Sequence, residues 1–248
     1  MRNYIIMSIH NRLSLTKKTL EQVFDFAGVD FTLWVVDDGS TDGTNEYFET
    51  LTPSGFCKNI EFTRYVEPKG KAKRLNVFLK EKDYDYCTVI DNDVLLPVDW
   101  LNKSVDILER YEGQVGMCCV NVQGLVDRIK VREAPGNPDF LIAAQIGGAC
   151  TTWGSFVRDN ITLFCEDYGR YGHEDAHITH QVRTLDRAVV CLREFGIHLD
   201  DRLKKSESDS EWDKEYKQMK DEAAQAGKPT LIENSQRMQR EWAERNQK

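Results

Sequence analysis

The stretch VVDDGSTDGT, residues 35–44, joins a predicted strand to a predicted helix. The apolar run from Phe31 to Val36 is typical of a buried strand, and it ends in two aspartates. The next polar residues, Ser40, Thr41 and Asp42, are types that cap the N-termini of helices. The stretch therefore predicts a strand–turn–helix unit with acidic side chains at the carboxyl end of the strand.

The same alternation of strand and helix extends through the first half of the chain. Ser14 is expected to cap the first helix, and Pro97 is expected in the first turn of the fourth. Strands separated by helices predict an α/β fold, in which a Rossmann-like, mainly parallel sheet has helices on both faces. Strands are predicted over residues 4–8, 31–36, 60–66, 86–90 and 115–122, and helices over 15–26, 41–51, 71–82 and 97–111.

The second half is less regular. Strands are predicted over residues 128–132, 140–146 and 188–193, with a helix over 174–184. Beyond residue 201 the composition becomes rich in Glu, Lys, Gln and Arg. We therefore expect one domain over residues 1–201 and a C-terminal helical extension over 202–248, which either packs on the domain or is a solvated tail.

Composition excludes several classes of protein. The 248 residues carry a net charge of −8, which argues against a general binder of nucleic acid or of anionic membranes. The chain lacks an apolar run long enough to span a membrane, and residues 1–8 do not resemble a signal peptide. The seven cysteines include no CxxC pair, so we expect reduced thiols and a cytoplasmic location.

Three polar clusters follow predicted strands, at residues 8–12, 37–44 and 91–93. In parallel sheets, ligands bind beyond the carboxyl ends of the strands, so these clusters predict a binding site. Two carboxylates spaced like Asp91 and Asp93 can share a divalent cation and its diphosphate ligand, although a lone Asp-x-Asp is also a common acidic turn.

The ordered set of motifs resembles glycosyltransferase family 2, whose members have the GT-A fold, over about residues 3–201. Its parts are IIMSIHNR (5–12), VVDDGSTDGT (35–44), GKAKRLN (70–76), DND (91–93) and GHED (172–175), with Arg183 after the last. The resemblance implies a nucleotide-binding half over residues 1–95 and an acceptor and catalytic half over 96–201. It implies transfer of a sugar from a nucleotide sugar, with a UDP-sugar as the expected donor.

The resemblance also assigns roles to residues. Ser8 and Asp38 would contact uracil and ribose, and His10 would lie near the base. Asp93 would bind Mn²⁺ or Mg²⁺ directly, with Asp91 and His198 completing the metal site. The other residues expected at the nucleotide sugar are Asn11, Arg12, Asp37, Lys71, Lys73, Asn92 and Gly148.

Asp175 is our candidate for the general base that deprotonates the acceptor hydroxyl, and direct displacement would invert the anomeric carbon. Glu174 is the competing candidate. The acceptor is expected to be a glycan or glycolipid, and nothing in the sequence favours a modified DNA base. Residues 202–248 hold 11 Lys and Arg against 10 Asp and Glu, so residues 1–201 carry −9. This acidity predicts a cleft that needs a cation to accept a nucleotide sugar.

Alternatives remain for each of these interpretations. His173 and His177 satisfy the H-E-x-x-H pattern of zinc proteases, although the glycines before them place the first histidine at a helix start. A catalytically silent protein that binds nucleotide sugars would carry most of the same motifs. His198 could be a buried structural histidine, Gly148 part of a bulge, and Trp153 either a core residue or a wall of the acceptor site.

Overall fold

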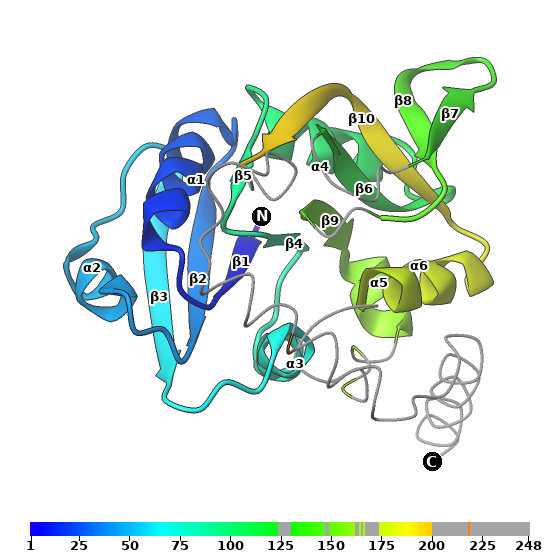
Figure 1. Ribbon diagram of the computed structural model, residues 1–248. Coiled ribbons are helices and arrows are strands. Elements are labelled where there is room, and N and C mark those ends of the chain that lie inside the picture. Colours follow the sequence, from blue (N-terminus) through cyan, green and yellow to red (C-terminus); the bar gives the residue numbers. More distant parts are fainter. Residues whose placement is uncertain are drawn as a thin grey trace.

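The computed structural model describes residues 1–123, 130–146, 149–161, 164, 166, 174–199 and 218. Within them, one sheet has helices on both faces, which confirms the expected α/β class (Figure 1). The strands are β1 (Asn3–Ile9), β2 (Phe31–Asp38), β3 (Cys57–Tyr65), β4 (Tyr86–Ile90), β5 (Val94–Leu95), β6 (Val115–Gln123), β7 (Val131–Ala134), β8 (Asn137–Ala143), β9 (Cys150–Gly154) and β10 (Ala188–His198). The helices are α1 (Leu13–Phe26), α2 (Thr44–Thr50), α3 (Lys71–Glu81), α4 (Trp100–Arg110), α5 (Ser155–Asn160) and α6 (Glu174–Thr184).

The sheet is parallel at one end and mixed at the other. Its order is β3-β2-β1-β4-β9-β6-β10-β8-β7, and β5 pairs with β10 outside this path. Strands β3, β2, β1 and β4 are parallel neighbours, as are β6 and β10. Strand β9 runs antiparallel to both β4 and β6, so the sheet is less parallel than expected.

The segment β9–α5 was not predicted from the sequence, and neither was the two-residue strand β5. Strand β9 has only five residues, which is too short a run to give a clear strand pattern in the sequence. In addition, no helical pattern separates it from β8. Trp153 of β9 is 1% exposed, and its indole N–H donates to Tyr84 Oη at 3.1 Å. Of the two roles considered for Trp153, the structure therefore supports that of a core residue and not that of a wall of the acceptor site.

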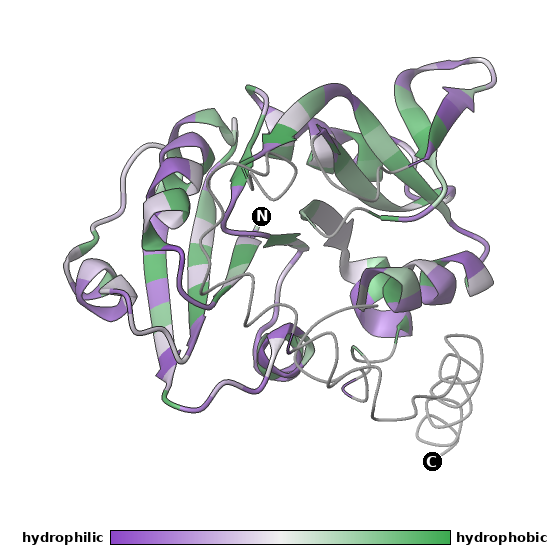
Figure 2. Cartoon of the chain, viewed as in Figure 1, coloured by the Kyte–Doolittle hydropathy of each residue, from purple (hydrophilic) through white to green (hydrophobic). Residues whose placement is uncertain are grey.

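Each face of the sheet has its own apolar core. Helices α1, α2 and α4 cover one face with side chains such as Leu20 and Trp100. Helices α3, α5 and α6 cover the other with side chains such as Phe78, Val157 and Ile178. In Figure 2 the strands are largely hydrophobic, while the helices carry hydrophilic stretches between their hydrophobic ones. Burial on both faces explains the near-continuous apolar runs of the central strands.

Three predicted helix starts were wrong. Helix α2 begins at Thr44, with Gly43 rather than Ser40, Thr41 or Asp42 as its N-cap residue. Helix α1 begins at Leu13 with Arg12 as its N-cap residue, because the Leu13 amide donates to the Asp42 carboxylate at 2.8 Å. Ser14 therefore lies inside the helix. Helix α4 begins after Asp99, whose amide donates to the carbonyl of Phe26 at 2.7 Å, so Pro97 precedes the helix. The starts of α1 and α4 therefore depend on distant segments of the chain, the turn after β2 and the end of α1.

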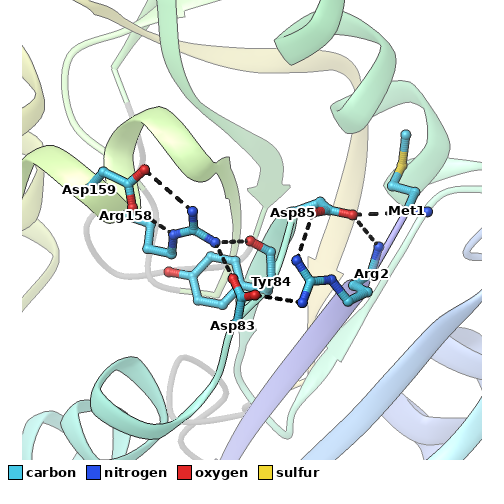
Figure 3. Close-up of polar contacts among 7 residues, drawn as sticks. All are labelled: Met1, Arg2, Asp83, Tyr84, Asp85, Arg158 and Asp159. Carbon is cyan, nitrogen blue, oxygen red and sulfur yellow. Dashed lines mark hydrogen bonds and ion pairs between the residues drawn. The ribbon is translucent and has the colours of Figure 1, made fainter.

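At the amino ends of β1 and β4, an ion-pair network joins three separate segments (Figure 3). Arg2 contacts Asp83 at 2.6 Å and Asp85 at 3.3 Å. Arg158 of α5 contacts the other Asp83 oxygen at 2.8 Å. This network ties the first strand, the loop before β4 and α5 together on the edge opposite the predicted site, and we call it the amino-edge network.

Some predictions fall outside the described residues. The extension over residues 202–248 does so except for Gln218, so its two helices remain a prediction. The six cysteines in the described part of the chain are all free and buried. No helix among the described residues has the length and apolarity that a membrane crossing requires.

Candidate active site

The candidate site is built on two turns that follow β1 and β2 and lock into each other. His10 donates through Nδ1 to the backbone oxygen of Asp38 at 2.8 Å. The Asn11 amide donates to Ser40 Oγ at 2.7 Å. In return, the Thr41 amide donates to Asn11 Oδ1 at 2.8 Å. These hydrogen bonds join the two turns into one unit. Some of the polar groups that were expected to contact the donor instead bond to the other turn.

Arg12 reaches the acidic motif after β4 from this unit. Asn11 and Arg12 both have left-handed backbone conformations, with φ of 57° and 67°. Non-glycine residues adopt this region rarely, and here it reverses the chain between β1 and α1. Arg12 Nη1 then lies 2.6 Å from Asp93 Oδ2, with the two side chains 11% and 5% exposed.

Asp38 is buried and fully engaged within the protein. Its two oxygens accept hydrogen bonds from the amides of Lys69 and Gly70 at 2.7–3.0 Å. Arg74 Nε donates to Asp38 Oδ1 at 2.5 Å, and the same guanidinium lies over the Tyr65 ring at 3.6 Å from its centroid. A carboxylate has about four acceptor sites and these three donors take up most of them, so the uracil contact expected for Asp38 would compete with its hydrogen bonds inside the protein.

Two other predicted residues of β1 and β2 have different surroundings. Asp37 is 0% exposed and accepts the Ser40 amide through Oδ1 at 2.9 Å. Its Oδ2 has no hydrogen-bond donor among the described residues, and Arg64 Nε is 3.7 Å away. Asp37 therefore shapes the turn after β2. Ser8 is half-buried beside Val36 in the parallel pair β1–β2.

The two lysines of α3 that were expected at the nucleotide sugar have different surroundings. Lys71 Nζ lies 2.6 Å from Asp91 Oδ1, with side chains 13% and 27% exposed. Lys73 is exposed, and two residues along a helix turn a side chain by about 200°. The structure therefore brings Lys71, but not Lys73, to the acidic motif.

The DND motif distributes its three side chains to different partners. Asn92 Nδ2 donates to the Asn11 carbonyl at 3.3 Å and to Thr16 Oγ1 at 2.9 Å, so it ties the motif to α1. Asp91 faces Lys71, and Asp93 faces Arg12. The two carboxylates thus have a positive partner each, so the charges of the DND motif are already compensated by the protein. This corrects the argument from net charge alone that the cleft must repel a nucleotide sugar.

His198 also meets Asp93. It is the last residue of β10, whose antiparallel pairing with β5 sets it opposite Val94. His198 Nε2 lies 3.3 Å from Asp93 Oδ1, and the Leu199 amide donates to the Asp93 carbonyl at 2.7 Å. Residues more than 100 positions apart in the chain therefore form one buried carboxylate–imidazole pair.

The two carboxyl groups differ in their pKa. Burial raises the pKa of Asp91, with the neighbouring Asp93 charge adding to the shift and Lys71 opposing it. Burial would also raise the pKa of Asp93, but the hydrogen bonds and charges of His198 and Arg12 outweigh it and lower the value. Asp93 is thus held as an anion, the form that binds a metal ion.

The fit to a metal ion is partial. Carboxylate and imidazole are suitable ligands for Mn²⁺, and Asp93 and His198 are already adjacent. Among the described residues, however, no three His, Cys, Asp or Glu side chains converge closely enough to hold a metal ion. A cation bound here would need further ligands from outside these side chains.

The catalytic candidates lie at the start of α6. This helix leads through a short turn into β10, so its N-terminus lies at the same edge of the sheet as His198. Asp175 is half-buried, its carbonyl accepts from Thr179 Oγ1 at 2.7 Å, and Thr179 also accepts the Ile146 amide at 3.0 Å. Glu174 opens the helix, while Gly148 lies outside the described residues.

Two residues important to the site were not assigned roles from the sequence. Arg74 neutralises Asp38, and Asn76 bridges to the segment after α5. Asn76 Oδ1 accepts the Phe164 amide at 2.9 Å, and its Nδ2 donates to Glu166 Oε1 at 2.8 Å. Both belong to the quoted GKAKRLN stretch, and the available signal was that a charged and an amide side chain lie at helix positions that are otherwise apolar.

Of the two histidines in the protease pattern, the structure describes only His177. His177 is 0% exposed, on α6, with its Nδ1 3.3 Å from Gln181 Nε2. His173, the other histidine of the pattern, lies outside the described residues.

Comparison with known proteins decides the family. Residues 4–159 match the model of glycosyl transferase family 2. The chain belongs to glycosyl transferase family 2. The match includes both turns, the α3 motif and DND, so family membership, the GT-A fold and glycosyltransferase class expected from the sequence are confirmed.

Relatives of this family 2 chain are distant. An uncharacterized glycosyltransferase of Rickettsia felis is 25% identical over 167 residues, which are 66% of this chain and 26% of that one. The chain thus spans about a quarter of the length of this curated relative.

Two solved structures share the fold. The mannosyltransferase PcManGT of Pyrobaculum calidifontis, in complex with GDP-Man and Mn²⁺, has a TM-score of 0.60 at 18% identity, over 81% of this chain and 58% of that one. TarS 1–349 of S. aureus, in complex with UDP-GlcNAc, has a TM-score of 0.62 at 15% identity, over 84% and 62%.

Proposed function

We propose that this family 2 domain transfers a sugar from a UDP-sugar to a hydroxyl acceptor with the help of Mn²⁺ or Mg²⁺ and with inversion of the anomeric carbon. The observation that carries the proposal is the buried Asp93–His198 pair at the carboxyl edge of the sheet, flanked by Arg12 and Lys71. It offers ligands for a cation beside two positive side chains for a diphosphate. The UDP-GlcNAc and the Mn²⁺ bound by the two similar folds support this assignment.

In this proposal Asp93 and His198 hold the cation, and Asp91 contributes through ribose or a metal-bound water. A bound cation neutralises the charge that develops on the leaving diphosphate. Arg12 and Lys71 bind the diphosphate oxygens, for which a guanidinium is suited by its planar pair of donors. The nucleoside lies over the two locked turns, near Ser8, His10 and the loop that Asp38 holds.

Asp175 is the proposed general base. A carboxylate at the first turn of α6 can accept the proton of an acceptor hydroxyl as that oxygen attacks the anomeric carbon opposite the diphosphate. This direct displacement is the reason for proposing inversion. Glu174 is the alternative base at the same helix start.

The division of labour follows from these positions. We propose residues 1–95 as the nucleotide-binding half and residues 96–201, with Asp175 and His198, as the acceptor and catalytic half. A glycan or glycolipid is the proposed acceptor, with residues 202–248 as a helical extension. The free buried thiols support a reducing, cytoplasmic compartment.

A screen of UDP-sugars tests the function, with UDP release measured in the presence of Mn²⁺ and again with excess chelator. The proposal expects release with at least one donor, lost on chelation. A silent binding protein would instead bind UDP with Mn²⁺ in isothermal titration but release no product from any donor and acceptor. That outcome would reject the enzymatic proposal.

A further inference from the structure

We propose that Arg12 and Lys71 are built-in counter-ions that compete with the divalent cation, and that the diphosphate of the donor relieves this competition by binding both side chains. The inference rests on the proposed function and adds to it a coupling between the binding of the cation and the binding of the donor. It predicts that the cation and the nucleotide bind cooperatively, each weakly without the other.

The strongest support is the contact of Arg12 with Asp93. At 2.6 Å from Oδ2, Nη1 places a full positive charge against the carboxylate that would bind the cation. The two side chains are 11% and 5% exposed, so solvent screens the pair only slightly. The second oxygen, Oδ1, faces His198 at 3.3 Å. A cation that uses both oxygens of Asp93 therefore has to displace the guanidinium.

Only the side chain of Arg12 needs to move for this displacement. Its carbonyl accepts the amides of Leu15 and Thr16 at 3.0 and 3.1 Å, which fixes the backbone as the N-cap of α1. The preceding Asn11 is held by Ser40. The long side chain can swing while its root stays in place, so the exchange requires no refolding of the turn.

Lys71 repeats the arrangement at the other end of the motif. It is the first residue of α3, and its Nζ lies 2.6 Å from Asp91 Oδ1. Asp91 and Asp93 therefore each carry one internal cation. A bare divalent ion entering between them meets two positive charges, and like charges in a poorly screened site repel strongly.

A bound diphosphate removes the repulsion between the divalent ion and the two positive side chains. Its oxygens accept charge-assisted hydrogen bonds from guanidinium and ammonium groups, so it gives both side chains a new partner when they leave the carboxylates. Coupling between two ligands is reciprocal, so the nucleotide must tighten cation binding by the same factor as the cation tightens nucleotide binding.

The test measures Mn²⁺ binding directly, from the electron paramagnetic resonance signal of free Mn²⁺, with and without UDP. For the natural protein we expect UDP to lower the Kd for Mn²⁺ on the order of tenfold or more. Arg12→Met removes the charge and keeps the length of the side chain. It is expected to bind Mn²⁺ without UDP on the order of tenfold more tightly than the natural protein and to lose most of the enhancement by UDP.

Three further variants make the result specific. Arg12→Lys restores a cation at this position and should therefore reverse the tighter Mn²⁺ binding that Arg12→Met shows without UDP. Arg110→Met removes the same charge from the exposed surface of α4, where Arg110 pairs with Asp106, and should change neither Kd. Lys71→Met tests the second counter-ion independently, should Arg12→Met prove too unstable to purify. Thermal unfolding with and without Mn²⁺ checks folding, and Mn²⁺ alone should raise the Tm of Arg12→Met more than that of the natural protein.

Different results would overturn the counter-ion inference and the proposed function. If UDP promotes Mn²⁺ binding in the natural protein but neither Arg12→Met nor Lys71→Met binds Mn²⁺ alone more tightly, the counter-ion inference is overturned and the proposed function stands. If the natural protein binds no Mn²⁺ even with UDP, the metal requirement of the proposed function fails, and the inference fails with it.

Discussion

The two edges of the parallel strands use the same residue types in opposite settings. At the carboxyl edge, Arg74 pairs with Asp38 and both side chains are 6% exposed. At the amino edge, Arg2 pairs with Asp83 and the side chains are 55% and 69% exposed (Figure 3). Both pairs have short N–O distances, 2.5 and 2.6 Å, so geometry alone does not distinguish them.

Burial gives the two edges different energetics. Exposed ion pairs are screened by water, and holding two long side chains in place costs entropy, so such pairs contribute little. A buried charge loses its hydration, and removing its partner leaves that cost uncompensated. Charges that are retained at such a cost are candidates for function, which is why the carboxyl edge is the place to look for chemistry.

The largest effect is expected for Asp93→Asn. The amide is a weaker metal ligand and cannot neutralise Arg12, so the stabilisation of the leaving diphosphate should be lost. We expect UDP release to fall by about three orders of magnitude or more, since a metal ion supplies several kcal/mol at the transition state. Steady-state UDP release under saturating Mn²⁺ measures it. Near-natural turnover in this variant would remove Asp93 from the metal site.

The next effect concerns the base. Asp175→Asn should retain UDP binding, because the residue lies on α6 and not on the turns after β1 and β2. Turnover should fall by ~10²–10⁴-fold, the usual contribution of a general base. Isothermal titration with UDP and a transfer assay separate the two quantities. Should turnover survive while Glu174→Gln abolishes it, the base is Glu174.

Asp38→Asn tests the carboxyl edge for stability. The variant keeps the shape of the side chain but leaves Arg74 buried without its counter-charge. We expect the free energy of unfolding to fall by about 3–5 kcal/mol, as when one partner of a buried pair is removed. Urea denaturation followed by circular dichroism measures the change, with Asp83→Asn as the matched control.

The smallest effect is expected for that control. Asp83→Asn removes the carboxylate that Arg2 and Arg158 share in the amino-edge network. Because Asp83 is 69% exposed, water can solvate both arginines in the variant. The denaturation midpoint and UDP release should therefore match those of the natural protein within error. A loss comparable to that of Asp38→Asn would show that burial does not separate the two edges.

Local sequence patterns predicted much of this arrangement. The apolar runs placed β1, β2, β4 and β6 to within a few residues, and Glu174–Thr184 is a helix with the expected bounds. The polar clusters at the strand ends were correctly placed at one edge, because parallel strands present their carboxyl ends together. The short strand β9 had no such signal, and the start of α1 depended on Asp42, a residue 29 positions away from Leu13.

The sequence by itself indicated the family, the α/β class and most of the acidic residues that lie at the carboxyl edge, but it left out Arg74 and wrongly included Lys73 among their basic neighbours. Only the tertiary structure decided which of them pair. Arg12 meets Asp93 across 81 positions, and Arg74 meets Asp38 across 36. Such pairings depend on the order of strands in the sheet and on how deeply each side chain is buried, and neither quantity is encoded in local periodicity. The acidic excess of the sequence therefore suggested a negative site, whereas the fold gives Asp38, Asp91 and Asp93 positive partners from the protein itself.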